Sequence, residues 1–532
     1  MQTQAQEQRI FERRWWTLAV LALSLLVIGL DNTILNVALP TLALDLKASG
    51  SQLQWLVDSY VLVFAGLLLT AGNLGDRFGR KWALFAGLIV FAIGSLLSAY
   101  SGSAEHLILT RALMGAGGAF IMPTTLSILT NIFPARERGR AIALWAAVFG
   151  LAIPLGPVVG GWLLEHFWWG SVFLVNLPVV ALALVSGFFL VPNSKNPEEA
   201  QLDPPGALLS IAGLAALLYA IIEAPNRGWT DPAILAVFGV AVVLLGLFAL
   251  WELRTPHPLL DTHLFENARF TAASVAVTLV FFALFGTIFF LTQYLQFVLR
   301  YSALEAGYRM VPIAAGILVG APLSARLAER IGTKLVVTAG LLIVSLGLYI
   351  MSFVSQTSGY SLILITLLIV SFGMGMAMAP ATDSIMGAVP KEHAGVGSAV
   401  NDTTRQVGGA LGVAVLGSLL STFYSQRIAD VATGFAPPAA KMVEDSIGEA
   451  ARVAQTLDPA TAGLLMSGAR DAFIHAMGTT VLIGAGFAFA GAVVAFLFLP
   501  ARDPVVEAER RAAAEEKARE QERQQERERM EV

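Results

Sequence analysis

The chain has 532 residues, of which 56% are hydrophobic and only 14% are charged, and its formal net charge is −4. Because soluble domains carry roughly 25% charged residues, this composition excludes an ordinary soluble domain and favours a protein embedded in a membrane. The chain has no cysteine, which excludes disulfides, thiol chemistry and cysteine-ligated metal sites.

Apolar stretches long enough to cross a bilayer as helices recur along the whole chain. The first begins behind Arg13 and Arg14 and is too long for the core of a cleavable signal peptide, so we predict that it is retained as a span. The stretches do not alternate apolar and polar residues as the strands of a membrane barrel do. We predict an all-α membrane protein with fourteen transmembrane helices at 16–39, 54–74, 82–101, 106–131, 139–164, 171–191, 206–224, 232–252, 270–298, 304–328, 333–355, 360–388, 394–421 and 473–499.

The distribution of Lys and Arg predicts the orientation of the spans, because these residues stay on the cytoplasmic side during insertion. With the N-terminus in the cytoplasm, inward-facing segments hold 24 Lys and Arg and outward-facing segments hold 8. An even number of spans then puts both termini in the cytoplasm. The charged tail has Glu507–Arg511 and Glu515–Arg519 at helical spacing, so we expect a solvated, partly helical segment. A partner-binding coiled segment is the alternative.

The stretch "GNLGDRFGRK" at 72–81 places four charges and three glycines between two apolar spans. Glycines let helix ends and a tight turn approach closely. The acid in this turn can accept hydrogen bonds at the N-terminus of a neighbouring helix, where the helix dipole favours negative charge. We therefore predict a cytoplasmic gate that stabilises one conformation, rather than only a positively charged turn. Its residues are Gly72, Asp76, Arg77, Gly79, Arg80 and Lys81.

A second copy of this stretch, "RLAERIGTK" at 326–334, follows the first at an offset of 253 residues. It has Glu329 in place of Asp76 and Thr333 in place of a basic residue. Transporters build two bundles from such repeats. The predicted division is a cytoplasmic N-terminus 1–15, a six-helix bundle 16–191, a linker 192–269 with two inserted spans, a six-helix bundle 270–499 that includes an extracytoplasmic loop 422–472 with two short helices, and a cytoplasmic tail 500–532.

These motifs resemble those of the major facilitator superfamily, in particular its fourteen-span drug:proton antiporter-2 branch. "GNLGDRFGRK" is similar to the superfamily's signature loop, and "LDNTILNVALPTL" at 30–42 to the branch's first-span motif. "LTRALMGAGGA" at 109–119 resembles the motif around the fourth-span arginine. "SAVNDTTRQVGGALGVAVLGS" at 398–418 resembles span 13 of quaternary-ammonium and dye exporters. The resemblance implies a fold of two six-helix bundles with two inserted helices.

The fifth span carries "GLAIPLGPVVGG", which resembles the antiporter motif of the same branch. Its prolines remove two helix hydrogen bonds, and its glycines leave a smooth face for close packing. We expect a bent helix that gates against leak; a tight helix contact without gating is the alternative. The motif residues are Gly150, Pro154, Gly156, Pro157, Gly160 and Gly161.

Ionisable residues at membrane depth are costly and mark functional candidates. Asp31 and Asp58 are predicted at similar depth in the outer half, where burial disfavours the charged form and lets a carboxylate hold a proton. The alternatives are an Asp31 hydrogen-bonded to Asn32 or Asn36, and an Asp58 that only caps its helix. The resemblance implies a proton or cation role for both acids.

Three further charges lie in the spans of the predicted C-terminal bundle, and one in span 4. Arg111 needs an acid or several carbonyls if it is buried, and the resemblance ties it to proton coupling; a structural ion pair is the alternative. Asp402 and Arg405 share one helix face and are expected either to act in coupling or to neutralise each other. Asp383 has no basic neighbour in the sequence, so it is a candidate to receive a cation or a proton.

Aromatic residues attract cations in dry surroundings, although most in membrane helices face lipid or pack between helices. We predict a pocket wall formed by Tyr60, Phe285, Phe289, Gln293 and Tyr294.

The sequence therefore predicts an inner-membrane antiporter that exports amphipathic cationic drugs, dyes or quaternary ammonium compounds in exchange for protons. The alternatives are an exporter of one endogenous metabolite, antibiotic, lipid or siderophore, and a receptor or scaffold that transports nothing. No HExxH, GxSxG or phosphate-binding GxxxxGK[ST] motif is present, so an enzyme is not expected. We expect a small-molecule substrate, protons and the lipid bilayer as partners, a monomer, and no cofactor, metal or nucleic acid.

Overall fold

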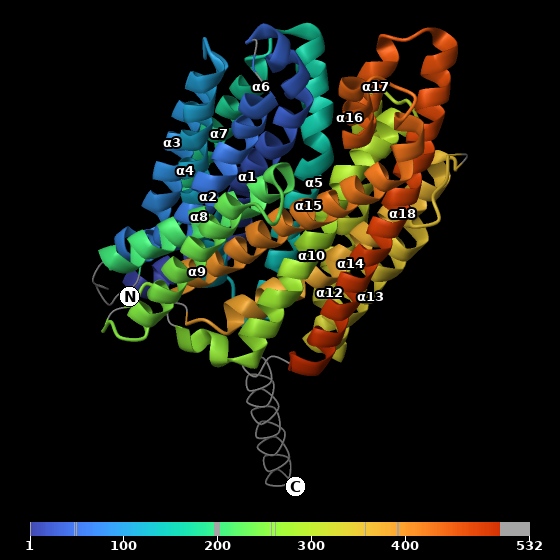
Figure 1. Cartoon of the computed structure of the whole chain (residues 1–532). Coiled ribbons are helices and arrows are strands. Elements are labelled where there is room, and N and C mark those ends of the chain that lie inside the picture. The colour runs from blue at the N-terminus through green and yellow to red at the C-terminus, as the bar shows by residue number, and fades with distance from the viewer. Residues whose placement is uncertain are drawn as a thin grey trace, which may run out of the picture.

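The computed structural model describes residues 2–500, except 47, 49, 196–202, 257, 261, 357 and 391–392. Within these residues it has fourteen segments that are helical, long and apolar enough to cross a membrane, and it has no strand (Figure 1). This confirms the predicted number of spans. The charged tail, with its predicted partly helical structure, lies outside the described residues.

The N-terminal half of the molecule consists of the helices that precede residue 191. Within it, α1 packs against α5 and α7, and α4 packs against α2 and α3. The sixth span is broken at Val175, which separates α6 from α7. The bounds are α1 Gln2–Asp45, α2 Gly50–Phe78, α3 Arg80–Ala99, α4 Ala104–Ile132, α5 Ala135–His166, α6 Ser171–Leu174 and α7 Asn176–Leu190.

Two helices, α8 (Pro204–Arg227) and α9 (Pro232–Glu252), pack against each other between the halves in sequence. Each begins with an aspartate cap and a proline in its first turn, a combination that suits a helix start because proline lacks the amide hydrogen that would be unpaired there. Helix α8 also packs against α2 and α15, whereas only 17% of the span in α9 is buried. Helix α9 is therefore peripheral, with an apolar surface suited to lipid.

The C-terminal half contains six further spans, several of them interrupted. Helix α10 continues into a π-helical turn, η2, and the tenth span is split at Val311 ahead of Pro312. The main contacts in this half join α12 and α13 to α14, α10 to α15, and α13 to α18. The bounds are η1 Thr262–Glu266, α10 Ala268–Gln293, η2 Tyr294–Val298, α11 Ala303–Met310, α12 Pro312–Ile331, α13 Thr333–Met351, α14 Tyr360–Gly387, α15 Ala394–Ala432, α16 Pro437–Asp445, α17 Ile447–Gln455 and α18 Pro459–Phe498.

The loop predicted at 422–472 is mostly helical, so the helices of spans 13 and 14 extend beyond the predicted ends of the spans. Helix α15 has 39 residues, which at 1.5 Å per residue is about 58 Å, roughly twice the thickness of the hydrocarbon core. Helix α18 has 40 residues and starts at Pro459 rather than near 473. The two short helices expected in this loop are α16 and α17. The hydropathy pattern located the ends of the apolar segments, but α15 and α18 continue as helices beyond those ends.

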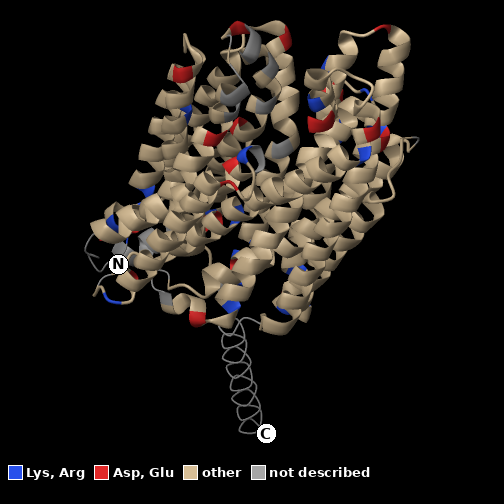
Figure 2. Cartoon of the chain, viewed as in Figure 1, with Lys and Arg blue, Asp and Glu red and all other residues tan. Residues whose placement is uncertain are grey.

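The start of α1 and the end of α18 lie at the same end of the molecule, which we call the termini end (Figure 1). Lys and Arg gather mainly towards this end, while a few charges lie deep inside the helices (Figure 2). The two halves contact each other mainly through α2 with α15 and through α5 with α12. These two interfaces, and the buried charges beside them, define the candidate site.

Candidate functional site

A buried ion pair connects α1 and α4 inside the N-terminal half. Asp31 is 0% exposed and Arg111 is 1% exposed, and Arg111 Nη1 lies 2.5 Å from Asp31 Oδ2. Arg111 also donates from Nε to the Leu56 carbonyl at 3.2 Å. The predicted need of a buried arginine for an acid or carbonyls is thus met by both.

Two further side chains complete the surroundings of this pair. Asn176 on α7 donates from Nδ2 to Asp31 Oδ1 at 3.3 Å and to Ser95 Oγ at 3.1 Å. The Arg111 guanidinium lies 4.5 Å from the centre of the Tyr60 ring. The Arg111 charge is thus neutralised by Asp31 and faces the Tyr60 ring, while the Asn176 amide donates to Asp31; these three partners come from different helices. The Asn36 side chain, one of the alternative partners of Asp31, lies outside the described side chains.

Asp58 differs from Asp31 in its exposure, because it is only half-buried. It lies on α2, two residues before Tyr60, and begins the second turn of the apolar part of that helix. The two acids predicted as a pair are therefore in unlike surroundings, one fully enclosed and one partly accessible.

Asp76 binds the N-terminus of a helix from the other half. The Gly395 amide donates to Asp76 Oδ2 at 2.8 Å and to Oδ1 at 3.0 Å, and the Val396 amide donates to Oδ2 at 3.3 Å. Both amides belong to the first turn of α15, where unpaired N–H groups and the helix dipole favour a negative charge. Arg80, which is fully buried, donates from Nε to Asp76 Oδ1 at 2.7 Å. The geometry expected for the segment 72–81 is present at the termini end.

Glycines make this contact sterically feasible. A Cβ atom on Gly72 would lie 2.5 Å from the carbonyl oxygen of Gly395, so only glycine allows the two backbones to meet. Gly79 ends the turn with a φ of 109°, and Gly332, its counterpart in the second copy, has a φ of 90°. Both lie in the left-handed region that favours glycine. The two copies therefore share a backbone conformation. Lys81 donates to the Phe188 carbonyl at 2.7 Å, and the Arg77 guanidinium lies over the Phe78 ring.

A second polar contact joins the halves at the termini end. Arg138 on α5 donates from Nε to Asp383 Oδ1 on α14 at 2.8 Å, across 245 residues of sequence. A Cβ atom on Gly139 would lie 3.7 Å from Asp383 Oδ2, an ordinary contact, so the ion pair does not require glycine there. Asp383, which has no basic neighbour in the sequence, thus has an arginine from the other half as its partner. This ion pair and the Asp76 contact together join the two halves at the termini end.

A third buried charge cluster lies where α5 meets the C-terminal half. Arg405 on α15 is 2% exposed, donates from Nη2 to Thr382 Oγ1 at 3.0 Å, and lies 3.8 Å from Asp402 Oδ1. Its guanidinium lies 4.8 Å from the Trp145 ring of α5 and 5.4 Å from the Phe281 ring of α10. Arg405 Nε and Nη1 have no hydrogen-bond partner among the described residues. The pairing of Asp402 with Arg405 is therefore present but long.

The glycines of α5 point to two different neighbours rather than forming one smooth face. Gly156 and Gly160 pack against Thr33 and Ile34 of α1. Gly150 and Gly161 pack against Ile317 of α12 and Leu304 of α11, which belong to the other half. Pro154 and Pro157 lie inside α5, which runs as one helix. This helix consequently has a close contact within its own half and another across the interface.

The five residues predicted as a pocket wall are distributed over both halves. Tyr60 is buried in the N-terminal half and stacks on Phe64, with ring centres 5.7 Å apart. Tyr294 is buried in the C-terminal half, where its hydroxyl donates to the Ser355 carbonyl at 3.1 Å. Phe285 and Gln293 are half-buried, and Phe289 is 41% exposed. The structure describes no contact that joins all five.

Sequence reasoning missed Asn176, Arg138 and Trp145. Asn176 is the only amide side chain in a span whose other polar residues are two serines, which was an available signal. Arg138 looked like one of several basic residues at a helix start, and Trp145 like an ordinary aromatic residue in a span. Among the described residues, no group of three or more His, Asp or Glu side chains has the arrangement of a metal site.

Comparison with known proteins identifies relatives over nearly the whole chain. The model of the Major Facilitator Superfamily matches residues 21–413. The chain is 38% identical to the multidrug efflux pump LfrA of Mycolicibacterium smegmatis, over 91% of this chain and 95% of that protein. It is 33% identical to the tetracenomycin C resistance and export protein of Streptomyces glaucescens, over 92% and 93% of the two chains. It is also 33% identical to the methyl viologen resistance protein SmvA of Salmonella typhimurium, over 87% and 93%.

Solved structures show the same fold. The proton:xylose symporter XylE superposes with a TM-score of 0.62 at 14% identity, over 92% of this chain and 96% of that one. The fold, the fourteen candidate spans and the relatives all indicate that the chain is a multi-pass membrane transporter rather than an enzyme. The chain belongs to the Major Facilitator Superfamily.

Proposed function

We propose that this protein exports amphipathic cationic compounds from the cytoplasm in exchange for protons. The observation that carries the proposal is the Asp31–Arg111 pair, a fully buried carboxylate and guanidinium at membrane depth. Such groups are expensive in a membrane interior and are retained mainly where ions or protons move. Names of relatives support drug export: one is a multidrug efflux pump and another a methyl viologen resistance protein, and methyl viologen is an organic cation.

In the proposed cycle, the bundles 16–191 and 270–499 rock against each other while the linker 192–269 spans between them. Asp31 is either protonated and neutral, or ionised and paired with Arg111. Protonation of Asp31 removes the partner of Arg111 and frees α4 to shift against α1. Asp58, which is half-buried on α2, is the group through which protons from outside reach Asp31. Each proton moving inward supplies about 2.3 kcal/mol per 100 mV of membrane potential.

The cationic substrate is proposed to meet the charges and rings at the interface of the halves. Asp402 supplies negative charge there, and Phe281 and Phe285, with ring centres 6.0 Å apart, supply aromatic faces. Arg405 now occupies the Trp145 and Phe281 faces, so a substrate cation competes with it for them. Asp383 is tied to Arg138 and is proposed to become available only when the termini end opens.

The closed end carries the proposed gate. In this proposal the protein lies in the inner membrane as a monomer. Its termini end faces the cytoplasm, so both termini are cytoplasmic. Opening to the cytoplasm breaks the Asp76 contact with α15 and the Arg138–Asp383 pair, while the glycine contacts of α5 with α1 and α12 rearrange.

Ethidium uptake into everted membrane vesicles, whose cytoplasmic face points outward, tests this proposal. We expect ethidium addition to dissipate a preformed proton gradient, and an uncoupler to stop ethidium movement. The Asp31→Asn variant should insert normally and do neither. Ethidium transport that continued in the uncoupler would exclude proton exchange.

A second candidate has its own support, since one relative is named for resistance to and export of a single compound, tetracenomycin C. An exporter dedicated to one endogenous compound would use the same proton site with a narrower pocket. A panel of unrelated cations distinguishes the two, because transport of several favours the broad exporter. A receptor or scaffold would transport none of them.

A further inference from the structure

The two interfaces between the halves are related by the internal repeat, but their packing differs. At the α2–α15 interface, Gly72 and Gly395 bring the backbones into contact. The offset of 253 residues places Ala325 of α12 at the position of Gly72. At the α5–α12 interface, Ala325 lines a cavity. The repeat thus places a close glycine contact at one interface and a cavity within the other.

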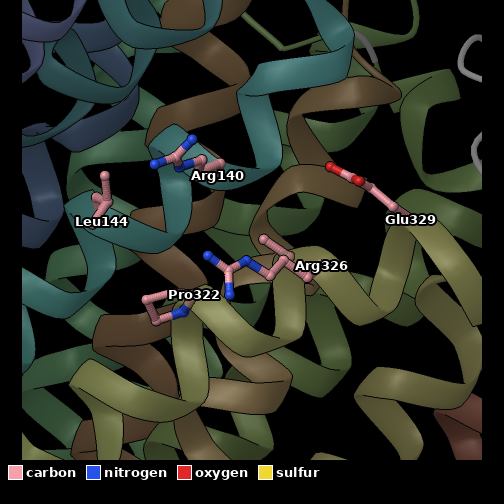
Figure 3. A pocket seen from close by; sticks show the side chains of 6 residues that line it. Arg140, Leu144, Pro322, Arg326 and Glu329 are labelled. Carbon is pink, nitrogen blue, oxygen red and sulfur yellow. The ribbon is translucent and has the colours of Figure 1, made fainter.

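This cavity has a volume of about 120 Å³, well above the roughly 10–15 Å³ that a single water needs. We call it the arginine cavity (Figure 3). Its lining comes from α5 and α12, that is, from both halves of the molecule. The lining residues are Arg140, Leu144, Pro322, Ala325, Arg326 and Glu329.

Two guanidinium groups face this space. Among the residues that the structure describes, neither Arg140 nor Arg326 donates a hydrogen bond or forms an ion pair. The Arg140 guanidinium lies 5.1 Å from the Trp15 ring, and its charge also acts on the Glu137 carboxylate, which is paired with Arg14. Both guanidinium groups lie on one side of the cavity and the Glu329 carboxylate lies on the other (Figure 3). Arg326 occupies the position at which the first copy of the repeat has Asn73. The lining therefore carries an excess positive charge.

The cavity lies near the ends of two membrane-spanning helices, where lipid headgroups are expected. Arg140 is five residues after the first residue of α5, and Arg326 is five residues before the last residue of α12, which is about 8 Å along each helix. Both helix ends belong to the termini end, and both arginines are exposed. Arginine binds phosphate with paired N–H donors, and anionic headgroups attract basic residues at this depth.

We propose that the arginine cavity binds the headgroup phosphate of an anionic phospholipid from the leaflet at the termini end. The phosphate accepts hydrogen bonds from Arg140 of one half and Arg326 of the other. It thereby joins the halves at the α5–α12 interface, as the Asp76 carboxylate joins them at the α2–α15 interface. Occupancy stabilises the conformation in which the termini end is closed. The proposal does not depend on the substrate or on proton coupling.

The test uses the full chain, purified in a zwitterionic detergent, with phosphatidylglycerol or phosphatidylcholine of the same acyl chains added. Thermal unfolding and native mass spectrometry report the shift in Tm and the number of retained lipids. We expect phosphatidylglycerol to raise the Tm and to leave one tightly held lipid on the wild type. In the Arg140→Gln/Arg326→Gln variant, the Tm rise should fall by at least half and that lipid should be lost. A control, Arg13→Gln/Arg254→Gln, removes two exposed charges outside the cavity and should behave as wild type.

Charge-preserving and milder changes keep the test decisive. Arg140→Lys/Arg326→Lys should retain most of the lipid effect. If the glutamine variant does not fold, Arg326→Asn, which installs the residue type of the first copy, carries the same expectation of a smaller Tm rise. The proposal is overturned if all variants respond equally, since that is a general attraction to anionic membrane surfaces. It is also overturned if the wild type does not respond, or if inorganic phosphate alone reproduces the Tm rise.

Discussion

The contact between Asp76 and α15 makes a quantitative prediction about the closed conformation. In Asp76→Asn, the side chain keeps its size but loses the charge that the Gly395 and Val396 N–H groups and the dipole of α15 stabilise. A charge at a helix N-terminus contributes up to about 2 kcal/mol in a partly buried site. Because this contact joins the two halves, about 1–2 kcal/mol should be lost from the closed state, a roughly 5–30-fold change in the ratio of closed to open molecules.

The absence of cysteine allows this ratio to be measured directly, because a single introduced thiol has no background. Ala399 of α15 is 0% exposed and lies beside Gly72 in the closed interface, so Ala399→Cys should react with a maleimide only when the termini end opens. We expect the labelling rate to rise roughly 5–30-fold when Asp76→Asn is added.

The control for this experiment is Asp231→Asn. Asp231 accepts hydrogen bonds from the amides of Ala233 and Ile234, so it has the same capping chemistry within a single helix. It should leave the labelling of Ala399→Cys unchanged. Equal labelling in Asp76→Asn and the parent, or an equal rise in both aspartate variants, would refute the assignment of Asp76 to the interface between the halves.

Three other predictions follow from the same contacts. Asp31→Asn should lower the free energy of unfolding by about 3–5 kcal/mol, because it leaves Arg111 buried and unpaired. In thermal unfolding, the double variant Asp31→Asn/Arg111→Gln should recover this stability, although it should not recover transport. A double variant as unstable as the single one contradicts this prediction. Gly72→Ala should favour the open termini end, seen as faster labelling of Ala399→Cys, whereas Gly66→Ala, whose Cβ would lie 3.6 Å from its nearest neighbour, should have no effect. Exchanging the charges of Arg138 and Asp383 should restore transport lost in Asp383→Arg alone, and failure of the exchange would argue against a pairing role.

The internal repeat shows how far sequence reasoning reached. Repetition of "NLGDRFGRK" as "RLAERIGTK" predicted two related turns, and the positive φ angles of Gly79 and Gly332 confirm that they share a conformation. The repeat did not predict that the interfaces would differ. That difference depends on whether a glycine in one half meets a glycine in the other, which is a property of two distant segments at once.

The partners of the buried charges show the complementary limit. Burial at membrane depth implied that Arg111 and Asp383 needed counter-charges, because an isolated charge there is costly. Which residue supplies the counter-charge depends on the packing of the helices: Asp31 lies 80 residues from Arg111, and Arg138 lies 245 residues from Asp383. Sequence spacing within one helix suggested only local pairs such as Asp402 with Arg405, and that pair proved long at 3.8 Å.

The amino-acid sequence by itself determined that this protein has fourteen apolar helices, because a bilayer imposes a length and a polarity that each segment must satisfy alone. It also determined which charged residues lie within the apolar segments. Only the tertiary structure decided which charges neutralise each other, which interface carries the glycine contact and which contains the cavity, and how far α15 and α18 extend beyond the apolar core. These properties arise from contacts between helices that are remote in the chain, and no local pattern of residues specifies them.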